Sequence, residues 1–545
     1  MRPTLDRIGR LLVQFLRFGL VPLFLGCGLE QGGGRLGSAL LELILLEEVL
    51  PDAPLALPEQ QVLPLITRGR QIVDRQGKPV QLRCVNWYGA HMQDMVVGGL
   101  HKQPLDSLVR SIHTLGFNCV RLPYSLEMHL DRGISRPSSD AVKANPHFVN
   151  MTVSSIFDAT IKALAAAHIM VILNNHQGKA MWCCSEDDGE GLWFSKEYSE
   201  EDWLRSLRSL ARQYRAEPYV VGYDLRNEPR GIPADTARSL QLQPQGRYLW
   251  PSWSKITEPG HANWAVGALH GGLAVAEEDP DALIIVEGLD FATDLRGVAL
   301  EPLHRQSHLQ GRVVYEVHDY CWYHPSFFRS WQLYWLSLGW LLCAIFEMRK
   351  MKFKVGVIDE HRDDAGHTWP LPSPIVKKLL FLCAASAMIS SWMVSYSSFK
   401  AKLDDRWGYI LEANEAPIWL GEFGTNGYWT TAVWWMEVGE VLWLQHLLRY
   451  VREHELGYAY WALNGDKQGE VETFGLFKEE QNDWEGMSMR VTAVGPSHRH
   501  AVPVGSAGLR VGSSADLRAS KACRATAPQR PVMRTYEDLV EHLSN

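Results

Sequence analysis

The chain has 545 residues, of which 46% are hydrophobic and 21% charged, a globular composition with room for one large domain or several ordinary ones. A formal net charge of -8 excludes the clustered basic surface that nucleic-acid binding requires, so we expect no nucleic-acid partner. The nine cysteines lack zinc-site spacing, so no metal site is expected. Cys84 and Cys119 lie in strand-like runs, where buried free thiols are commoner than disulfides.

The amino-terminal segment 1–27 combines a basic start with a nearly apolar run, which resembles a signal peptide or signal anchor. An amphipathic surface helix is the alternative, because Arg17 interrupts the apolar run. Residues 28–66 are rich in Leu, Gly and Pro and are predicted to be a linker or leader. We therefore expect a secreted protein, or a membrane-anchored one whose folded part lies outside the cytoplasm.

Between Arg68 and Trp484, short apolar runs alternate with amphipathic segments, which predicts an α/β fold with parallel strands. The expected strands are Leu82–Trp87, Cys119–Leu122, Met170–Asn175, Val220–Arg226, Leu283–Glu287, Val313–His318, Ile418–Gly421 and Tyr458–Ala462. The expected helices are Pro104–Leu115, Val149–Ala167, Glu200–Tyr214, Asn263–Glu277, Leu403–Ala413 and Trp434–His454. Eight such strands predict a (β/α)8 TIM barrel over residues 67–486, followed by a disordered tail at 487–545.

One segment departs from the barrel pattern, because about eighty residues separate Pro325 from Trp407 where barrel loops are far shorter. We predict a long insertion after the sixth strand, at 326–394, with charge-free runs at Ser330–Phe346 and Leu379–Phe399. By length the runs could form a membrane hairpin. A packed insert, a disordered insert or an artefact of the gene model are the alternatives, because one run is short and the other is rich in Ser.

Two carboxylates directly follow β-branched and aromatic runs: Glu228 ends VVGYDLRNE, and Glu422 lies in APIWLGEFG. Barrel enzymes carry their catalytic groups at such strand ends. Hydrolysis of a glycosidic bond with retention uses two carboxyl groups, one as nucleophile and one as proton donor. We therefore expect Glu228 and Glu422 to be catalytic. The 21 Trp residues suit a sugar-binding protein, although Trp also fills cores.

Further motifs lie at predicted strand ends, in the order CVNWYG (84–89), LGFNCVRLPYS (115–125), NNH (174–176), DLRNEP (224–229), VHDY (317–320), WLGEFGTNG (419–427) and YWALNG (460–465). In this order they resemble glycoside hydrolase family 5, of clan A, and especially its bacterial-type endo-β-1,4-glucanases (cellulases). The sequence departs from the family in the loop after NNH and in the segment 326–394.

The resemblance implies that Glu422 is the nucleophile and Glu228 the general acid/base. It also implies that Arg121 faces Glu422, where a guanidinium would lower the pKa of the nucleophile. Asn227 would bind the sugar 2-hydroxyl. Because Asn227 and Glu228 would point oppositely on a regular strand, both can reach the site only from irregular backbone.

The resemblance assigns supporting roles to other polar and aromatic residues. His318 and Tyr320 would hold the two carboxylates, His176 would lie near the cleavage point, and Trp461 would lie beneath the cleaved sugar. Residues on presumed loops above the barrel are expected to form sugar platforms; they are Trp87, His91, Trp182 and Trp193.

The expected function is therefore double displacement at internal β-1,4-glucosidic bonds of cellulose or a related β-glucan, without metal or cofactor. The alternatives are another family 5 activity, such as that of a mannanase, an exo-β-glucosidase or an endoglycoceramidase, or an inactive membrane-associated barrel. The substrate partner would be a β-glucan polysaccharide or oligosaccharide, and the leader or the insertion could add membrane association.

Overall fold

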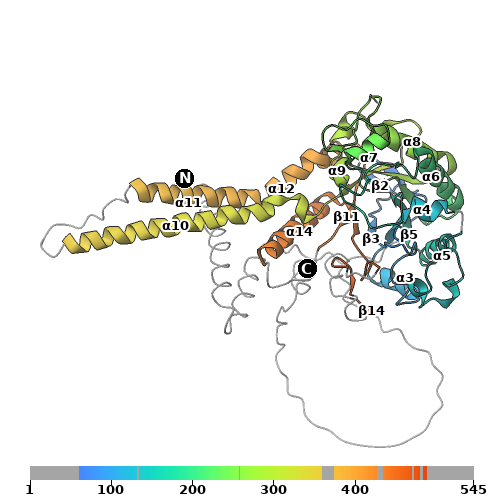
Figure 1. Ribbon diagram of the computed structural model, residues 1–545, viewed down its shortest axis with the longest axis horizontal. Coiled ribbons are helices and arrows are strands. Elements are labelled where there is room, and N and C mark those ends of the chain that lie inside the picture. The colour runs from blue at the N-terminus through green and yellow to red at the C-terminus, as the bar shows by residue number, and fades with distance from the viewer. Residues whose placement is uncertain are drawn as a thin grey trace, which may run out of the picture.

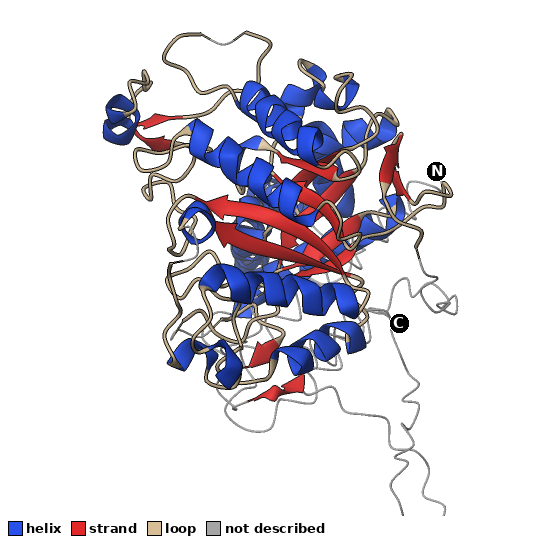
Figure 2. Ribbon diagram, turned by 90° about the vertical axis from the view of Figure 1, so that its right-hand side faces the viewer, coloured by secondary structure: helices blue, strands red, loops and turns tan. Residues whose placement is uncertain are grey.

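The computed structural model describes residues 61–131, 134–256, 258–358, 374–425, 434–468, 472–478 and 483–487. Within them, eight parallel strands close into a barrel surrounded by helices (Figure 2), which is consistent with the predicted TIM barrel. Each strand overlaps a predicted one. The strands are β3 (Arg83–Asn86), β4 (Cys119–Ser125), β5 (Met170–Gln177), β6 (Val220–Asp224), β9 (Leu283–Glu287), β10 (Val313–His318), β11 (Ile418–Phe423) and β12 (Gly457–Tyr460).

The helices that follow the barrel strands bury one apolar face. In α6, Trp203, Leu207, Leu210 and Tyr214 are buried at helical spacing, and the first turn is closed by a capping box from Ser199. The helices and one π-helical turn are α3 (Leu105–Thr114), α4 (Leu126–Leu130), α5 (Val153–Ala166), α6 (Glu200–Tyr214), α7 (Ala234–Ser239), α8 (Trp264–Glu278), α9 (Leu289–Ala292), α10 (Pro325–Ile358), α11 (Pro374–Met393), α12 (Tyr396–Leu403), the π turn (Asp404–Gly408), α13 (Tyr409–Glu412) and α14 (Trp434–His454). The helix expected over Leu403–Ala413 is thus divided by the π-helical turn. Short antiparallel pairs join β1 (Ile66–Arg68) to β2 (Gln71–Val73), β7 (Ile232–Pro233) to β8 (Tyr248–Leu249) and β13 (Phe477–Lys478) to β14 (Asp483–Met487).

Alternate strand side chains build two cores. Cys119 points into the barrel with Ile172 and Val314, whereas Val120 and Leu122 pack outward under the helices. Cys84 and Cys119 are direct partners in the register of β3 and β4, and their sulfurs are joined in a disulfide. The prediction of free thiols there was therefore wrong, because neighbouring parallel strands bring the two side chains to one level of the barrel interior. Cys183 and Cys184 form a second disulfide.

Two long helices, α10 and α11, lie between β10 and β11 in the chain and project side by side away from the barrel (Figure 1). Ser337 Oγ lies 2.6 Å from Ser386 Oγ across their interface. By length and composition, α11 could cross a membrane. The predicted segment 1–27, residues 28–60 of the predicted linker at 28–66, and residues 488–545 of the predicted tail at 487–545 lie outside the described residues.

Candidate active site

The barrel interior changes from apolar to polar toward the carboxyl ends of its strands. Side chains two residues apart point the same way, so an apolar inward residue is followed two positions later by a polar one on the same face. The pairs are Cys84 and Asn86, Cys119 and Arg121, Ile172 and Asn174, Ile285 and Glu287, and Val314 and Glu316. Continuing by two more positions, β5 reaches His176 and β10 reaches His318. The polar layer therefore lies at the end of the barrel where such enzymes place their sites.

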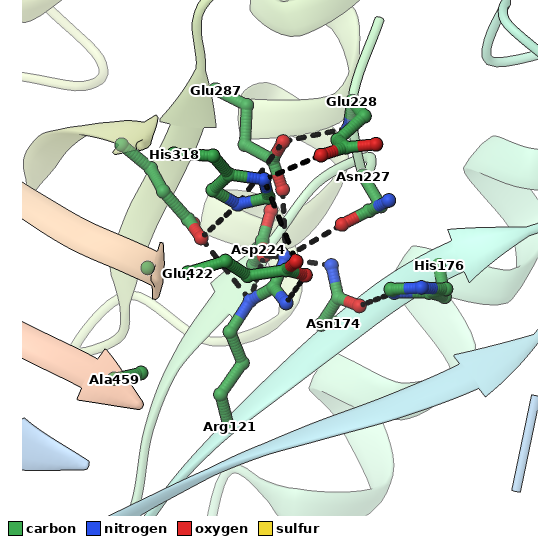
Figure 3. Close-up of polar contacts among 12 residues, drawn as sticks. Arg121, Asn174, His176, Asp224, Asn227, Glu228, Glu287, His318, Glu422 and Ala459 are labelled. Carbon is green, nitrogen blue, oxygen red and sulfur yellow. Dashed lines mark hydrogen bonds and ion pairs between the residues drawn. The ribbon is translucent and has the colours of Figure 1, made fainter. Parts of the chain in front are cut away.

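The Arg121 guanidinium lies at the centre of this layer and is fully buried (Figure 3). The guanidinium donates hydrogen bonds to the amide oxygens of Asn227 at 2.9 Å and Asn86 at 3.0 Å. Burial alone would lower the pKa of Arg121, but the surrounding carboxylates raise it well above its usual value, so the guanidinium stays charged. Its carboxylate partners are Asp224 at 2.8 Å, Glu287 at 2.8 Å, Glu316 at 3.1 Å and Glu422 at 2.6 Å.

Glu422 follows Gly421 near the end of β11, where a side chain at the glycine would collide with Glu316. One carboxylate oxygen of Glu422 accepts from Arg121, and the other accepts from Tyr320 OH at 3.2 Å. The contact expected between Arg121 and Glu422 is therefore present. Burial raises the pKa of Glu422, with His318 and Arg121 opposing, so the expected lowering effect of Arg121 is present but burial outweighs it.

Glu228 lies beyond the end of β6, and its φ of 46° places the residue in the left-handed region. The irregular backbone expected here is confirmed, and Asn227 and Glu228 both approach the polar layer. The Glu228 N–H donates to Glu287 Oε2 at 2.6 Å, and His318 Nδ1 lies 2.9 Å from Glu228 Oε1. Burial raises the pKa of Glu228 to about 7, although Arg230 and Arg121 oppose the shift.

One oxygen of Glu228, one oxygen of Glu422 and a ring nitrogen of His318 all lie within 4.8 Å of one another. A closest approach this short is nearer to the separation of about 5 to 5.5 Å between the carboxyl groups of retaining enzymes than to the roughly 6.5 to 9.5 Å of inverting ones. Two other groups in the described chain could geometrically hold a metal ion: Glu287, Glu316 and His318, and His176, Cys183 and Cys184. In the second group both sulfurs belong to the disulfide, which leaves no thiolate.

A cavity of about 410 Å³ opens above the two carboxylates. The predicted site residues His91, His176, Trp182, Tyr320 and Trp461 line it together with both carboxylates. The Trp461 ring stacks on Tyr88 with centroids 5.0 Å apart, and Trp182 meets it edge-on at 6.3 Å. Arg121, Asn227 and His318 are not among the lining residues. Arg121 and His318 contact the carboxylates from the barrel interior, whereas Asn227 contacts Arg121 through its amide oxygen and Cys184 Sγ through its amide nitrogen.

Two predicted sugar platforms are instead core residues. Trp87 is fully buried and donates from Nε1 to Gly98 O at 2.9 Å, and Trp193 packs against Trp264 at 5.3 Å. Neither lines the cavity, so both predictions are corrected. Trp87 follows the inward Asn86 by one position, and strand alternation turns its side chain outward.

Several cavity residues were not predicted. Trp322 is half exposed and stacks on Tyr320 at 4.3 Å; it lies two positions after the VHDY motif, which is a usable signal. Phe291 is held in left-handed backbone after β9. No sequence signal placed these loop residues around the cavity; they are Phe291, Tyr323, Lys467, Glu472, Thr473 and Phe474. Glu287 and Glu316 were also missed, although a carboxylate inside an apolar strand is itself a signal.

The sequence profile described as "Cellulase (glycosyl hydrolase family 5)" matches residues 73–467. An endoglucanase from Paenibacillus polymyxa is 25% identical over 433 residues, covering 77% of this chain and 83% of that protein. A "Glycosyl hydrolase 5 family protein" from Chamaecyparis obtusa is 28% identical over 450 residues, covering 77% of this chain, and the match spans only 63% of the Chamaecyparis protein.

Solved structures share the fold. The catalytic domain of the major endoglucanase from Xanthomonas campestris pv. campestris has a TM-score of 0.54 and 22% identity, covering 79% of this chain and 98% of that one. A cellotetraose complex of an endocellulase from Pyrococcus horikoshii has a TM-score of 0.55 and 20% identity, covering 80% of this chain and 100% of that one.

Proposed function

Because the chain belongs to the cellulase family, glycosyl hydrolase family 5, we propose that this glycosidase cleaves internal β-1,4-glucosidic bonds of cellulose or a related β-glucan with retention. The observation that carries the proposal is the pair of carboxylate oxygens, from Glu228 and Glu422, within 4.8 Å of each other at the cavity. The relatives named as endoglucanases and the cellotetraose complex support the choice of a β-glucan.

In the first step, a Glu422 oxygen attacks the anomeric carbon while Glu228 gives its proton to the departing glycosidic oxygen. The products are a glycosyl ester on Glu422 and a free alcohol. In the second step, Glu228 takes a proton from water as the water oxygen attacks the anomeric carbon and the ester bond to Glu422 breaks. Both carboxyl groups return to their starting states, and the product keeps its β-configuration.

The environments of the two carboxyl groups support this division. Arg121 and Tyr320 each donate a hydrogen bond to Glu422, which favours its ionised form. The Glu228 pKa of about 7 keeps much of this residue protonated near neutral pH, as a proton donor requires.

A chain of buried groups can orient the proton on Glu228. Burial lowers the pKa of His318 to about 4, so its ring is neutral and carries one N–H. Burial raises the pKa of Glu316 well above its usual value, with Arg121 opposing, and Glu316 Oε1 lies 3.2 Å from His318 Nε2. A protonated Glu316 would donate to Nε2, which leaves the His318 proton on Nδ1 to be donated to Glu228 Oε1. The acidic proton of Glu228 would then reside on Oε2, available to the substrate.

The remaining site residues would position the sugar. Trp461 and Trp182 offer aromatic surface to sugar rings, as does the unpredicted Trp322. His91 lines the cavity, and neither of its ring nitrogens has a partner among the described residues, so they can serve sugar hydroxyls. Asn227 has its amide oxygen held by Arg121, and its NH2 group lies 3.3 Å from Cys184 Sγ, a weak acceptor that the sugar 2-hydroxyl would have to replace.

We further propose that the catalytic barrel spans residues 67–486, with 326–394 as an insertion after the sixth strand, and that it lies outside the cytoplasm behind the leader at 1–27. Two disulfides suit an oxidising compartment, and one relative is named a major extracellular endoglucanase.

The deciding experiment follows the viscosity and the reducing ends of soluble carboxymethyl cellulose with the full-length protein. We expect rapid loss of viscosity with few new reducing ends, abolished by Glu422→Gln and kept by the surface control Glu415→Gln. Nuclear magnetic resonance of the fresh product should detect the β-anomer first. Activity confined to mannan, an aryl glucoside or a glycolipid would replace the substrate assignment, and an α-anomer formed first would refute retention.

Azide rescue assigns the two roles. In Glu422→Ala, azide can attack from the face of the missing nucleophile and should give an α-glycosyl azide from a substrate with a good leaving group. In Glu228→Ala, azide can replace water in the second step and should give the β-glycosyl azide. The reverse pairing of products would exchange the proposed roles.

A further inference from the structure

We propose that α10 and α11 form a hairpin that inserts into a lipid bilayer and holds the barrel at a membrane surface. The hairpin projects away from the barrel (Figure 1), and its outer surface is apolar. Large apolar side chains that the hairpin exposes include Leu336, Leu342, Ile345, Phe381, Ile389 and Trp392. Water-soluble helices turn such side chains toward a core.

The interior of the hairpin consists of small and polar residues instead. Ser337 and Ala344 of α10 are fully buried, and Cys383, Ala387 and Ser390 of α11 are nearly so. Ser390 Oγ donates to Ser330 O at 2.9 Å, in addition to the Ser337–Ser386 contact. Small residues at a helix interface, polar groups bonded across it and large apolar residues outside are the arrangement of helices packed in lipid.

The apolar band has nearly the length needed for a bilayer. The charge-free run Ser330–Phe346 would span about 25 Å of helix, against a hydrocarbon core of about 30 Å. The 20 residues of α11 span about 30 Å, and the helix is long and apolar enough to cross a membrane, with most of its apolar stretch exposed. The Ser337–Ser386 contact aligns the apolar runs of the two helices side by side.

The stretch of sequence that joins the two apolar runs is charged, whereas the runs themselves carry no charge. Between 347 and 378 it has seven basic residues, Arg349, Lys350, Lys352, Lys354, Arg362, Lys377 and Lys378, and five acidic ones, Glu347, Asp359, Glu360, Asp363 and Asp364. Short segments rich in Lys and Arg remain on the cytoplasmic side of membranes. A barrel outside the cytoplasm and this Lys- and Arg-containing connecting stretch inside it therefore agree with one topology, in which both helices cross the bilayer.

Cys343 provides a local probe of insertion, since it is exposed and lies within the apolar run of α10. The full-length protein, with Cys27, Cys321, Cys383 and Cys523 changed to Ser, is labelled at Cys343 with an environment-sensitive dye. We expect a blue-shifted emission in phosphatidylcholine vesicles and quenching by lipids spin-labelled in their acyl chains. A dye at Ile256→Cys in a Cys343→Ser background should respond to neither.

Flotation with the same vesicles at 0.5 M salt tests the apolar surface. Leu342→Asp, Phe381→Asp and Ile389→Asp together should reduce the floated fraction at least about tenfold. The matched control changes Ile134, Ile256 and Leu300 to Asp; these are at least as exposed, at 71%, 73% and 60% against 57%, 72% and 51%, but lie outside the hairpin. Circular dichroism melting should confirm that both variants are folded.

The probe at Cys343 separates hairpin insertion from binding through the leader. No acyl-chain quenching at Cys343 would overturn the proposal even if the protein floated. A blue shift without vesicles, together with a dimer by light scattering, would identify a second copy as the occupant of the apolar surface and would also overturn it. Binding only to anionic vesicles and lost at high salt would mean adsorption by charge, and would equally contradict insertion.

Discussion

Arg121 and Glu422 lie 301 residues apart in the sequence, yet Arg121 Nη1 donates to Glu422 Oε1 at 2.6 Å inside the barrel. The contact joins β4 to β11, which are not neighbouring strands. The same guanidinium also binds Asp224, Glu287 and Glu316, so a single cation balances several buried carboxyl groups. Arg121 therefore affects both the stability of the barrel and the charge state of the proposed nucleophile.

Replacing Arg121 should separate these two effects. Arg121→Met leaves buried carboxylates without their cation and should lower the free energy of unfolding by about 3 to 5 kcal/mol. Arg121→Lys keeps a charge but loses the planar set of donors, and should lower kcat by about 10² to 10³. Urea unfolding and steady-state kinetics measure the two effects. The control is Arg305→Met, which breaks a surface ion pair with Glu415 and should lower the free energy of unfolding by no more than about 1 kcal/mol. An equal loss of unfolding free energy in both Met variants would contradict the role of Arg121.

The raised pKa of Glu228 predicts the alkaline limb of activity. Glu228 must be protonated to act as the acid, so kcat/KM should fall as the pH rises through about 7. Asp188 raises the pKa of Glu228 and pairs with Arg230 at 2.6 Å. Asp188→Asn should therefore lower the pKa of Glu228 and move the limb to lower pH. Asp187→Asn, one residue away and exposed, should leave the limb in place; a limb unmoved by Asp188→Asn would exclude Glu228 as its source.

The strands and the carboxylate pair were predictable because both depend on local pattern. A buried strand has an unbroken apolar run, and the carboxylates that follow two such runs, Glu228 and Glu422, could be proposed from that pattern. Arg121 and His318 were predicted only through the family resemblance. Trp87 was placed wrongly because it was assigned to a loop above the barrel, whereas strand alternation after the inward Asn86 turns its side chain outward into the core. The Cys84–Cys119 disulfide depends on register between two strands, which no single run encodes. Phe291 and Phe474 reach the cavity from irregular loops, whose paths are set by tertiary contacts.

The protonated state expected for Glu316 has a consequence for stability. Its pKa is raised in the folded protein by burial, despite Arg121, so folding retains a proton that the unfolded chain releases above its usual pKa of about 4.5. The stability of the wild type should therefore decline as the pH rises above about 4.5, with at most about 1.4 kcal/mol per pH unit from this group. Glu316→Gln removes the titrating proton and should flatten this decline, as urea unfolding between pH 5 and pH 8 would measure.

Glu415 is the control, because hydrogen bonds from Arg305 and His304 lower its pKa. Its contribution to stability is therefore lost as the pH falls and not as it rises, so Glu415→Gln should leave the alkaline decline unchanged. An unaltered slope in Glu316→Gln would mean that Glu316 is ionised, and would remove the reason for placing the His318 proton on Nδ1.

Trp182 tests whether the cavity binds sugar through aromatic faces. Its side chain is 38% exposed, lines the cavity, and has Lys467 Nζ 4.8 Å from its ring centroid. Trp182→Ala should weaken oligosaccharide binding by about 1 kcal/mol, a factor of about 5 in KM, because one stacking face is lost while the carboxylates are untouched. Trp250 is the matched control: it is 46% exposed but absent from the cavity lining, and Trp250→Ala should leave KM unchanged. Kinetics on a series of cello-oligosaccharides would measure the effect, and the loss should appear only in substrates long enough to reach Trp182. A fall in kcat with unchanged KM, or an equal loss for the shortest substrate, would place Trp182 at the cleavage point instead of at a neighbouring sugar.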